Sequence, residues 1–152
     1  MEGRSRRSKN EPEPCFCKQP NITHPLQSAE DILFCVQQFR DKKQEYLITL
    51  SIDTGGRLIK RRIVTIGLLD TSIAHPREVF AGPLAEDRAY SIILVHNHPS
   101  GEAEPSNADI KTTQQLISAG ILLGVHLQDH FIVTKSGYFS FLEQGLIDAI
   151  SS

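Results

Sequence analysis

The sequence has little that would tie it to a membrane, to the cell exterior or to a polyanion. Its 152 residues contain no apolar run near the roughly 20 residues that cross a bilayer. The polar first residues are not followed by the hydrophobic region of a signal peptide. Only three cysteines are present, an odd set without a disulfide framework. A net charge of −2 does not favour a dominant electrostatic partner such as duplex DNA or an anionic membrane. We therefore expect a cytoplasmic protein.

The length and the ordinary apolar content predict one folded domain, residues 28–152, preceded by a flexible polar tail, residues 1–27. The tail carries a basic cluster formed by Arg4, Arg6, Arg7 and Lys9. Such a cluster is typical of a solvated tail, and contact with nucleic acid is the alternative. Cys15, Cys17 and His24 raise the alternative of a second metal site, although a single residue between two cysteines is not usual zinc-finger spacing.

Hydrophobic periodicity predicts strands and helices in mixed order. Ser28 is a capping residue for a helix over 28–42, and Cys35 lies on the apolar stripe of that helix as a buried thiol. The other predicted elements are strands over 45–52 and 57–66 joined by a hairpin turn, a short or broken helix from Pro76, a strand over 90–95, a helix over 106–119 ended by Gly120, strands over 121–127 and 130–134 around a turn at Gln128 and Asp129, and a last strand or helix over 138–150. Because hairpins dominate, we expect an α+β fold or a mixed-sheet α/β/α sandwich.

The strand over 90–95 runs directly into two histidines, His96 and His98. Residues two apart in a strand point to the same face, so both imidazoles can be directed at one point. A turn-rich loop then leads to Ser106 and Asp109, which open the next predicted helix. Two imidazoles and a carboxylate, with a fourth position left open, are the ligand set of a catalytic zinc site.

The downstream half of this pattern is ambiguous by itself, because Ser-x-x-Asp is also a helix-capping pattern. Ser28 and Asp31 repeat it without any histidine beside them. The specificity therefore lies in the combination of His-x-His, seven intervening residues and then Ser-x-x-Asp.

That combination resembles the JAMM, or MPN-plus, metalloprotease motif, and the variant His-Asn-His-Pro-Ser-Gly looks like the RadC branch of that family. The resemblance covers about Ser28 to Ile150 and includes the stretches that begin at His75 and Asp129. It implies a JAB or MPN domain, a cytidine-deaminase-like α/β/α sandwich with a central mixed sheet flanked by helices. Asn97 stands where many JAMM enzymes have Ser or Thr. The chain leaves no room for the helix-hairpin-helix region that RadC proteins usually carry, so a stand-alone catalytic-type domain is expected.

The same resemblance implies that His96, His98 and Asp109 hold Zn²⁺. The family carries a catalytic glutamate at the start of an early strand, a position that Glu45 matches. Glu78 is the rival candidate, although an acid in the first turn of a helix is explained by the helix dipole alone.

The implied activity is that of a zinc-dependent peptidase or isopeptidase acting on a peptide or protein substrate. A metal-activated water would attack an amide carbonyl, Glu45 would carry the proton, and the Ser106 hydroxyl would help to stabilise the oxyanion. Asp129 and His130 are candidates for orienting a ligand histidine. One alternative is a DNA-associated repair or recombination accessory protein, as the RadC label suggests. Another is a metal-free scaffold, which the complete ligand set disfavours.

Overall fold

The structure is a computed structural model that describes residues 18–67 and 74–148. Its elements in chain order are α1 (Ala29–Val36), the 3-10 turn η1 (Gln37–Phe39), β1 (Tyr46–Ile52), β2 (Leu58–Ile66), α2 (Pro76–Ala85), β3 (Ser91–Asn97), α3 (Asn107–Leu123), β4 (His126–Val133) and β5 (Tyr138–Ser140). The basic cluster of the tail, Cys15 and Cys17 lie outside the described residues, so the predictions made for them remain predictions.

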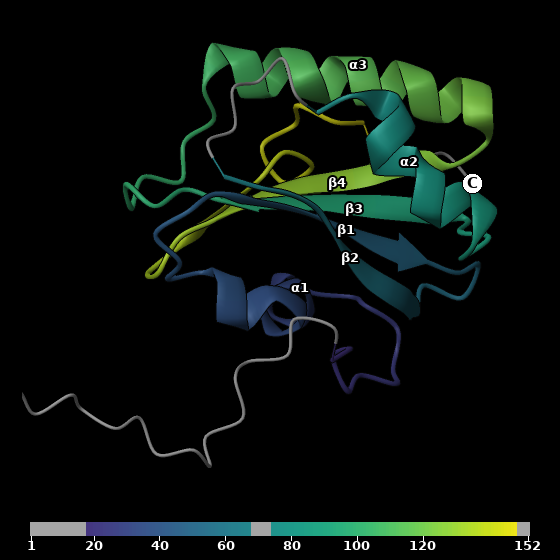
Figure 1. Ribbon diagram of the computed structural model, residues 1–152, viewed down its shortest axis with the longest axis horizontal. Helices are drawn as coiled ribbons and strands as arrows, with labels where there is room; N and C mark the ends of the chain where they lie inside the picture. Colours follow the sequence, from purple (N-terminus) through teal and green to yellow (C-terminus); the bar gives the residue numbers. More distant parts are fainter. Residues whose placement is uncertain (1–17, 68–73, 149–152) are drawn as a thin grey trace, which may run out of the picture.

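The five strands form one mixed sheet in the order β2-β1-β3-β4-β5. β1 is antiparallel to both β2 and β3, and β4 is antiparallel to β5. β3 and β4 are parallel, and α3 makes the crossover between them. In Figure 1, α2 and α3 lie on one side of the sheet and α1 on the other. This mixed sheet flanked by helices confirms the predicted α/β/α arrangement.

Alternate residues of the central strands fill two separate cores. Ile93 and Val95 of β3 pack with Cys35 and Phe39 on the α1 side. Ile92, Leu94 and Leu116 pack together on the side of α2 and α3. Because helices cover both faces, β1 and β3 are buried along their whole length. The alternation also shows on which face each functional side chain lies. His96 is two residues after Leu94, so it points to the same face, the α3 side.

Residues 18–27, predicted as part of a free tail, instead lie against the domain. The side chain of Gln19 exchanges hydrogen bonds with the backbone of Arg61, at 2.7 Å and 3.1 Å. The backbone N–H of Leu26 donates to the carbonyl of Gly56. Ile22 and Leu26 also pack against the core on the α1 side. The packed part of the described chain therefore begins before Ser28.

Two predictions about α3 and β4 are wrong. α3 does not end at Gly120 but continues to Leu123, and Gly124 caps it in the left-handed conformation with φ 73°. The apolar residues that follow Gly120, predicted as a strand, therefore form the last helical turn. β4 then runs unbroken through Gln128 and Asp129, where a turn was predicted. α2, predicted as a short or broken helix, is a ten-residue helix that runs unbroken through Pro83.

The β3-α3-β4 crossover determines where chemistry can take place. β3 ends at Asn97, and α3 begins at Asn107 above the same end of the sheet. The carboxyl end of a strand and the N-terminus of the helix that follows it are the usual location of ligand sites in parallel α/β units. Among residues 18–67 and 74–148, no helix has the length and apolar character needed to cross a membrane.

Candidate metal centre

The two predicted histidine ligands converge at the end of β3. His96 belongs to the strand, while His98 follows it and donates its backbone N–H to the Val133 carbonyl of β4 at 3.0 Å. This bond extends the strand pairing, so the two side chains keep the same face. Their Nε2 atoms lie 2.9 Å apart.

Asp109 reaches the same point from the first turn of α3. Ser106 is the N-cap: its Oγ accepts the Asp109 N–H at 3.0 Å, and Oδ2 of Asp109 accepts the Ser106 N–H at 2.9 Å. This capping box fixes the carboxylate. Oδ1 of Asp109 lies 3.6 Å from Nε2 of His96, and Oδ2 lies 3.4 Å from Nε2 of His98.

The spacing of the donor atoms fits a metal ion. One donor atom from each of His96, His98 and Asp109 lies within 4.8 Å of the other two. Neighbouring donors of a tetrahedral site with bonds of 2.0–2.1 Å lie about 3.3 Å apart, within the range spanned by the three separations. The side chain of His96 is 4 % exposed, whereas those of His98 and Asp109 are 16 % and 13 % exposed. The group can hold a metal ion and is open on the side of His98 and Asp109.

The charges within the group favour a cation. Burial alone would raise the pKa of Asp109, yet the neighbouring imidazoles of His96 and His98 hold that pKa well below its usual range. The pKa of His98 is raised, first by its hydrogen bond to Asp109, and the negative charge of Glu45 acts in the same direction. An ionised carboxylate that attracts positive charge onto a neighbouring imidazole would attract a metal ion in the same way.

Glu45 directly precedes β1 and lies close enough to His98 for its charge to act on the pKa of that imidazole. Leu47 of β1 pairs with His96 of β3, and continuing this antiparallel register by two residues places Glu45 opposite His98. Directly opposite residues point to the same face of an antiparallel pair. The effect of Glu45 on the pKa of His98 agrees with this position. Glu78, the rival candidate, is exposed in the first turn of α2.

Asn97, between the two histidines, points to the opposite face and holds the segment that carries Glu45. Its Oδ1 accepts the backbone N–H of Tyr46 at 2.7 Å. Its Nδ2 donates to the carbonyls of Gln44 at 2.9 Å and Lys42 at 3.4 Å. The residue that departs from the common JAMM pattern thus ties the end of β3 to the start of β1.

His130 confirms one of the two predicted contacts to a ligand histidine. Its Nε2 lies 2.7 Å from Nδ1 of His96, and burial lowers the pKa of its imidazole well below the usual value. Thr113 of α3 contacts the other ring nitrogen of His130. The sequence analysis missed Thr113, although its position one helical turn after Asp109 was a usable signal.

Asp129 does not contact a ligand histidine, so this half of the prediction is wrong. Its carboxylate accepts hydrogen bonds from the Ser140 hydroxyl at 2.6 Å and from the backbone N–H groups of Leu142 and His130. Burial raises the pKa of the carboxyl against these hydrogen bonds. Asp129 therefore fixes the β4–β5 connection and the backbone of His130.

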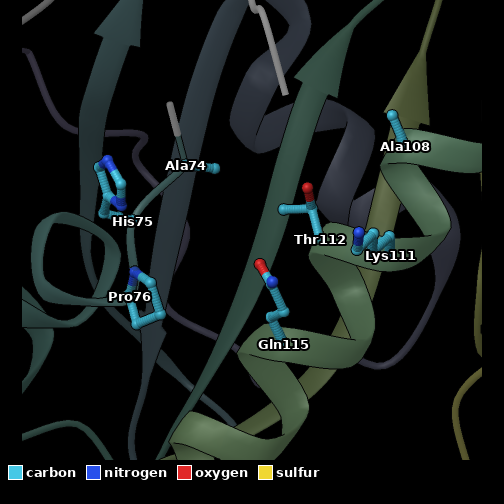
Figure 2. A pocket seen from close by; sticks show the side chains of 7 residues that line it. All are labelled: Ala74, His75, Pro76, Ala108, Lys111, Thr112 and Gln115. Carbon is cyan, nitrogen blue, oxygen red and sulfur yellow. The ribbon is translucent and has the colours of Figure 1, made fainter. Parts of the chain in front are cut away.

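A cavity of about 370 Å³ lies between the start of α2 and the first turns of α3. Its lining comes from the start of α2 and the first turns of α3: Ala74, His75, Pro76, Ala108, Lys111, Thr112 and Gln115. Figure 2 shows His75 and Pro76 facing Thr112 and Gln115 across the gap. The cavity lies on the face of α3 that carries Ala108 and Thr112, and its lining does not include His96, His98 or Asp109.

A mixed sheet flanked by helices, with two histidines at the end of a central strand and an aspartate in the first turn of the next helix, defines a JAB-type domain. A family model described as the RadC-like JAB domain matches residues 26–146. The chain therefore belongs to the RadC-like JAB domain family, as its sequence motifs indicated.

Curated relatives agree with this assignment. A UPF0758 protein of Pelodictyon phaeoclathratiforme is 41% identical over 128 residues, which cover 84% of this chain and 57% of that protein. A UPF0758 protein of Methanosarcina mazei is 44% identical over 133 residues, which cover 87% of this chain and 57% of that protein. The chain thus spans little more than half the length of the relatives it matches.

Proposed function

We propose that this protein is a zinc-dependent metallohydrolase that cleaves peptide or isopeptide bonds. The observation that carries the proposal is the convergence of His96, His98 and Asp109 on one partly open point. Two imidazoles and one carboxylate are a donor set of catalytic zinc, and such sites leave a fourth position for water or substrate. When bound there, a zinc ion would lower the pKa of a water molecule from about 15.7 toward about 7 and polarise the scissile carbonyl.

Glu45 is the proposed proton carrier. The role is supported by the register of β1 and β3, which, continued by two residues, brings Glu45 opposite His98, and by the effect of its charge on the pKa of His98. There it would accept a proton from the attacking water and deliver it to the leaving amine. General acid–base groups of this kind contribute about 100- to 10,000-fold in rate.

Ser106 is the proposed oxyanion donor. Its Oγ accepts the Asp109 N–H, which leaves the hydroxyl hydrogen free to donate toward a substrate oxygen. Capping the helix and stabilising an oxyanion thus use different parts of the same hydroxyl.

The test combines metal analysis with hydrolysis of a broad panel of peptides and isopeptides. Protein purified without chelators should hold one zinc ion, and Glu45→Gln should keep the zinc while losing about 100- to 10,000-fold in rate. Glu78→Gln is the matched control, and its rate should equal that of the wild type. Protein without stoichiometric zinc, or zinc-loaded protein inactive on the whole panel, would overturn the proposal.

A further inference from the structure

The hydroxyl of Thr113 sets the direction of a buried hydrogen-bond chain. Its Oγ1 lies 2.8 Å from the backbone oxygen of Asp109 and 2.6 Å from Nδ1 of His130. A hydroxyl has a single hydrogen, and a carbonyl oxygen can only accept. The hydroxyl therefore donates to Asp109, and Nδ1 of His130 must donate to the hydroxyl.

His130 passes this direction on to the metal-binding group. The residue is 1 % exposed, and its ring stacks on Phe141 with the ring centroids 4.4 Å apart. A neutral imidazole that donates through Nδ1 has a bare Nε2 that can only accept. That Nε2 lies 2.7 Å from Nδ1 of His96, so His96 must donate through Nδ1.

We propose that Thr113 and His130 are positioning residues that fix the tautomer of His96, so that its Nε2 lone pair faces His98 and Asp109. The inference rests on the proposed function only in naming the bound group as zinc. The opposite tautomer of His96 would place a hydrogen on Nε2 and block its use as a ligand.

A single hydrogen bond orients the ring of His98. Its Nδ1 lies 2.8 Å from the backbone oxygen of Glu102, which can only accept, so Nδ1 donates and Nε2 is the atom left for a metal ion. Without a metal ion, Nε2 of His98 carries the hydrogen that the lone pair of His96 Nε2 accepts at 2.9 Å. Both predicted ligand histidines therefore direct Nε2 at the metal-binding point. His98 is held by a backbone carbonyl, and His96 is held by the side chains of His130 and Thr113. Of the two, only the arrangement at His96 depends on side chains and can be changed by substitution.

Nitrogen NMR of the histidine rings in metal-free protein tests the chain directly. We expect His96 and His130 each to carry hydrogen on Nδ1 and none on Nε2. A wild-type His96 with hydrogen on Nε2 would overturn the inference. Wild-type protein with the expected tautomers but no zinc binding would contradict the proposed hydrolase while supporting the hydrogen-bond chain, so the two failures are distinguishable.

Variants of Thr113 separate positioning from packing. In Thr113→Val the acceptor for His130 is gone, so the tautomers of His130 and His96 should both reverse, and zinc affinity should fall about 10- to 100-fold. Thr113→Ser keeps the hydroxyl and should restore both readouts. Ser118→Ala removes another α3 hydroxyl that donates to the carbonyl four residues earlier, at 3.2 Å from Gln114, and should match the wild type in both readouts. Unchanged tautomers and affinity in Thr113→Val would contradict the inference.

Discussion

The side-chain oxygen of Asn97 accepts a hydrogen bond of 2.7 Å from the backbone N–H of Tyr46, the residue that follows Glu45. Asn97 itself is 1 % exposed and lies between the two histidines of the metal-binding group. The strand that supplies the histidines therefore also holds the segment that supplies the proposed proton carrier. The geometry between the donor group and Glu45 depends on one buried amide.

Replacing that amide should separate proton transfer from metal binding. Asn97→Ala would remove the side-chain acceptor of the buried Tyr46 N–H and a donor to the Gln44 carbonyl, at a cost of about 1–3 kcal/mol in the free energy of unfolding. We expect one zinc ion to remain bound and kcat to fall more than KM rises, because Glu45 loses its support. Urea unfolding, metal analysis and kinetics measure these effects. Asn107→Ala, at an exposed asparagine of α3, is the matched control.

The two capping boxes of the chain offer a direct test of the metal ligands. Ser28 and Asp31 at α1 repeat the mutual hydrogen bonds of Ser106 and Asp109 at α3. Asp109→Ala and Asp31→Ala each remove one box, so thermal unfolding should shift downward in both. Only Asp109→Ala should lose zinc. Equal zinc content in both variants would show that Asp109 is merely a capping residue.

The sequence pattern predicted the donor group because its information is local. His96 and His98 lie two residues apart in one strand, and Ser106 and Asp109 lie one turn apart at a helix start. Strand and helix periodicity suffice to orient such pairs. The partners that come from distant segments were harder to predict. Thr113 contacts His130 only because the crossover through α3 brings that helix over β4.

The errors in secondary structure have physical causes that lie in tertiary packing. Asp129 resembled a turn residue, but Ser140 and Leu142 satisfy its carboxylate inside the sheet. Gly120 followed an apolar helical pattern and resembled a C-cap. Its actual role is close packing, since a Cβ at Gly120 would meet the backbone oxygen of Val125 at 2.5 Å.

Because of this close approach, we expect Gly120→Ala to destabilise the protein, whereas glycine to alanine in a helix usually stabilises. Gly to Ala in a helix interior usually stabilises by about 1 kcal/mol. In Gly120→Ala the new methyl would collide with backbone rather than with a flexible side chain, so we expect a loss of at least about 1 kcal/mol. Chemical denaturation measures it. Ser118→Ala, at an exposed position of the same helix, provides the reference for the ordinary gain in helix propensity.

The thiol of Cys35 provides a test in the alkaline range. Cys35 is fully buried in the core on the α1 side, as its place on the apolar stripe predicted. Burial raises the pKa of the thiol from 9.0 to about 11, although the charge of Arg61 opposes the shift. A thiol with a raised pKa in the folded state ionises first in the unfolded state. Rising pH above about 9 therefore favours unfolding.

We expect the free energy of unfolding to fall between pH 9 and pH 11 more steeply in the wild type than in Cys35→Ala. One pKa unit corresponds to about 1.4 kcal/mol, so the difference between the two curves should reach about 2 kcal/mol. Urea unfolding with a reducing agent and a chelator present measures both curves. The cavity left by the alanine lowers the whole curve of the variant, so the slope and not the absolute stability carries the result. Parallel curves would show that the buried thiol does not contribute to the pH dependence.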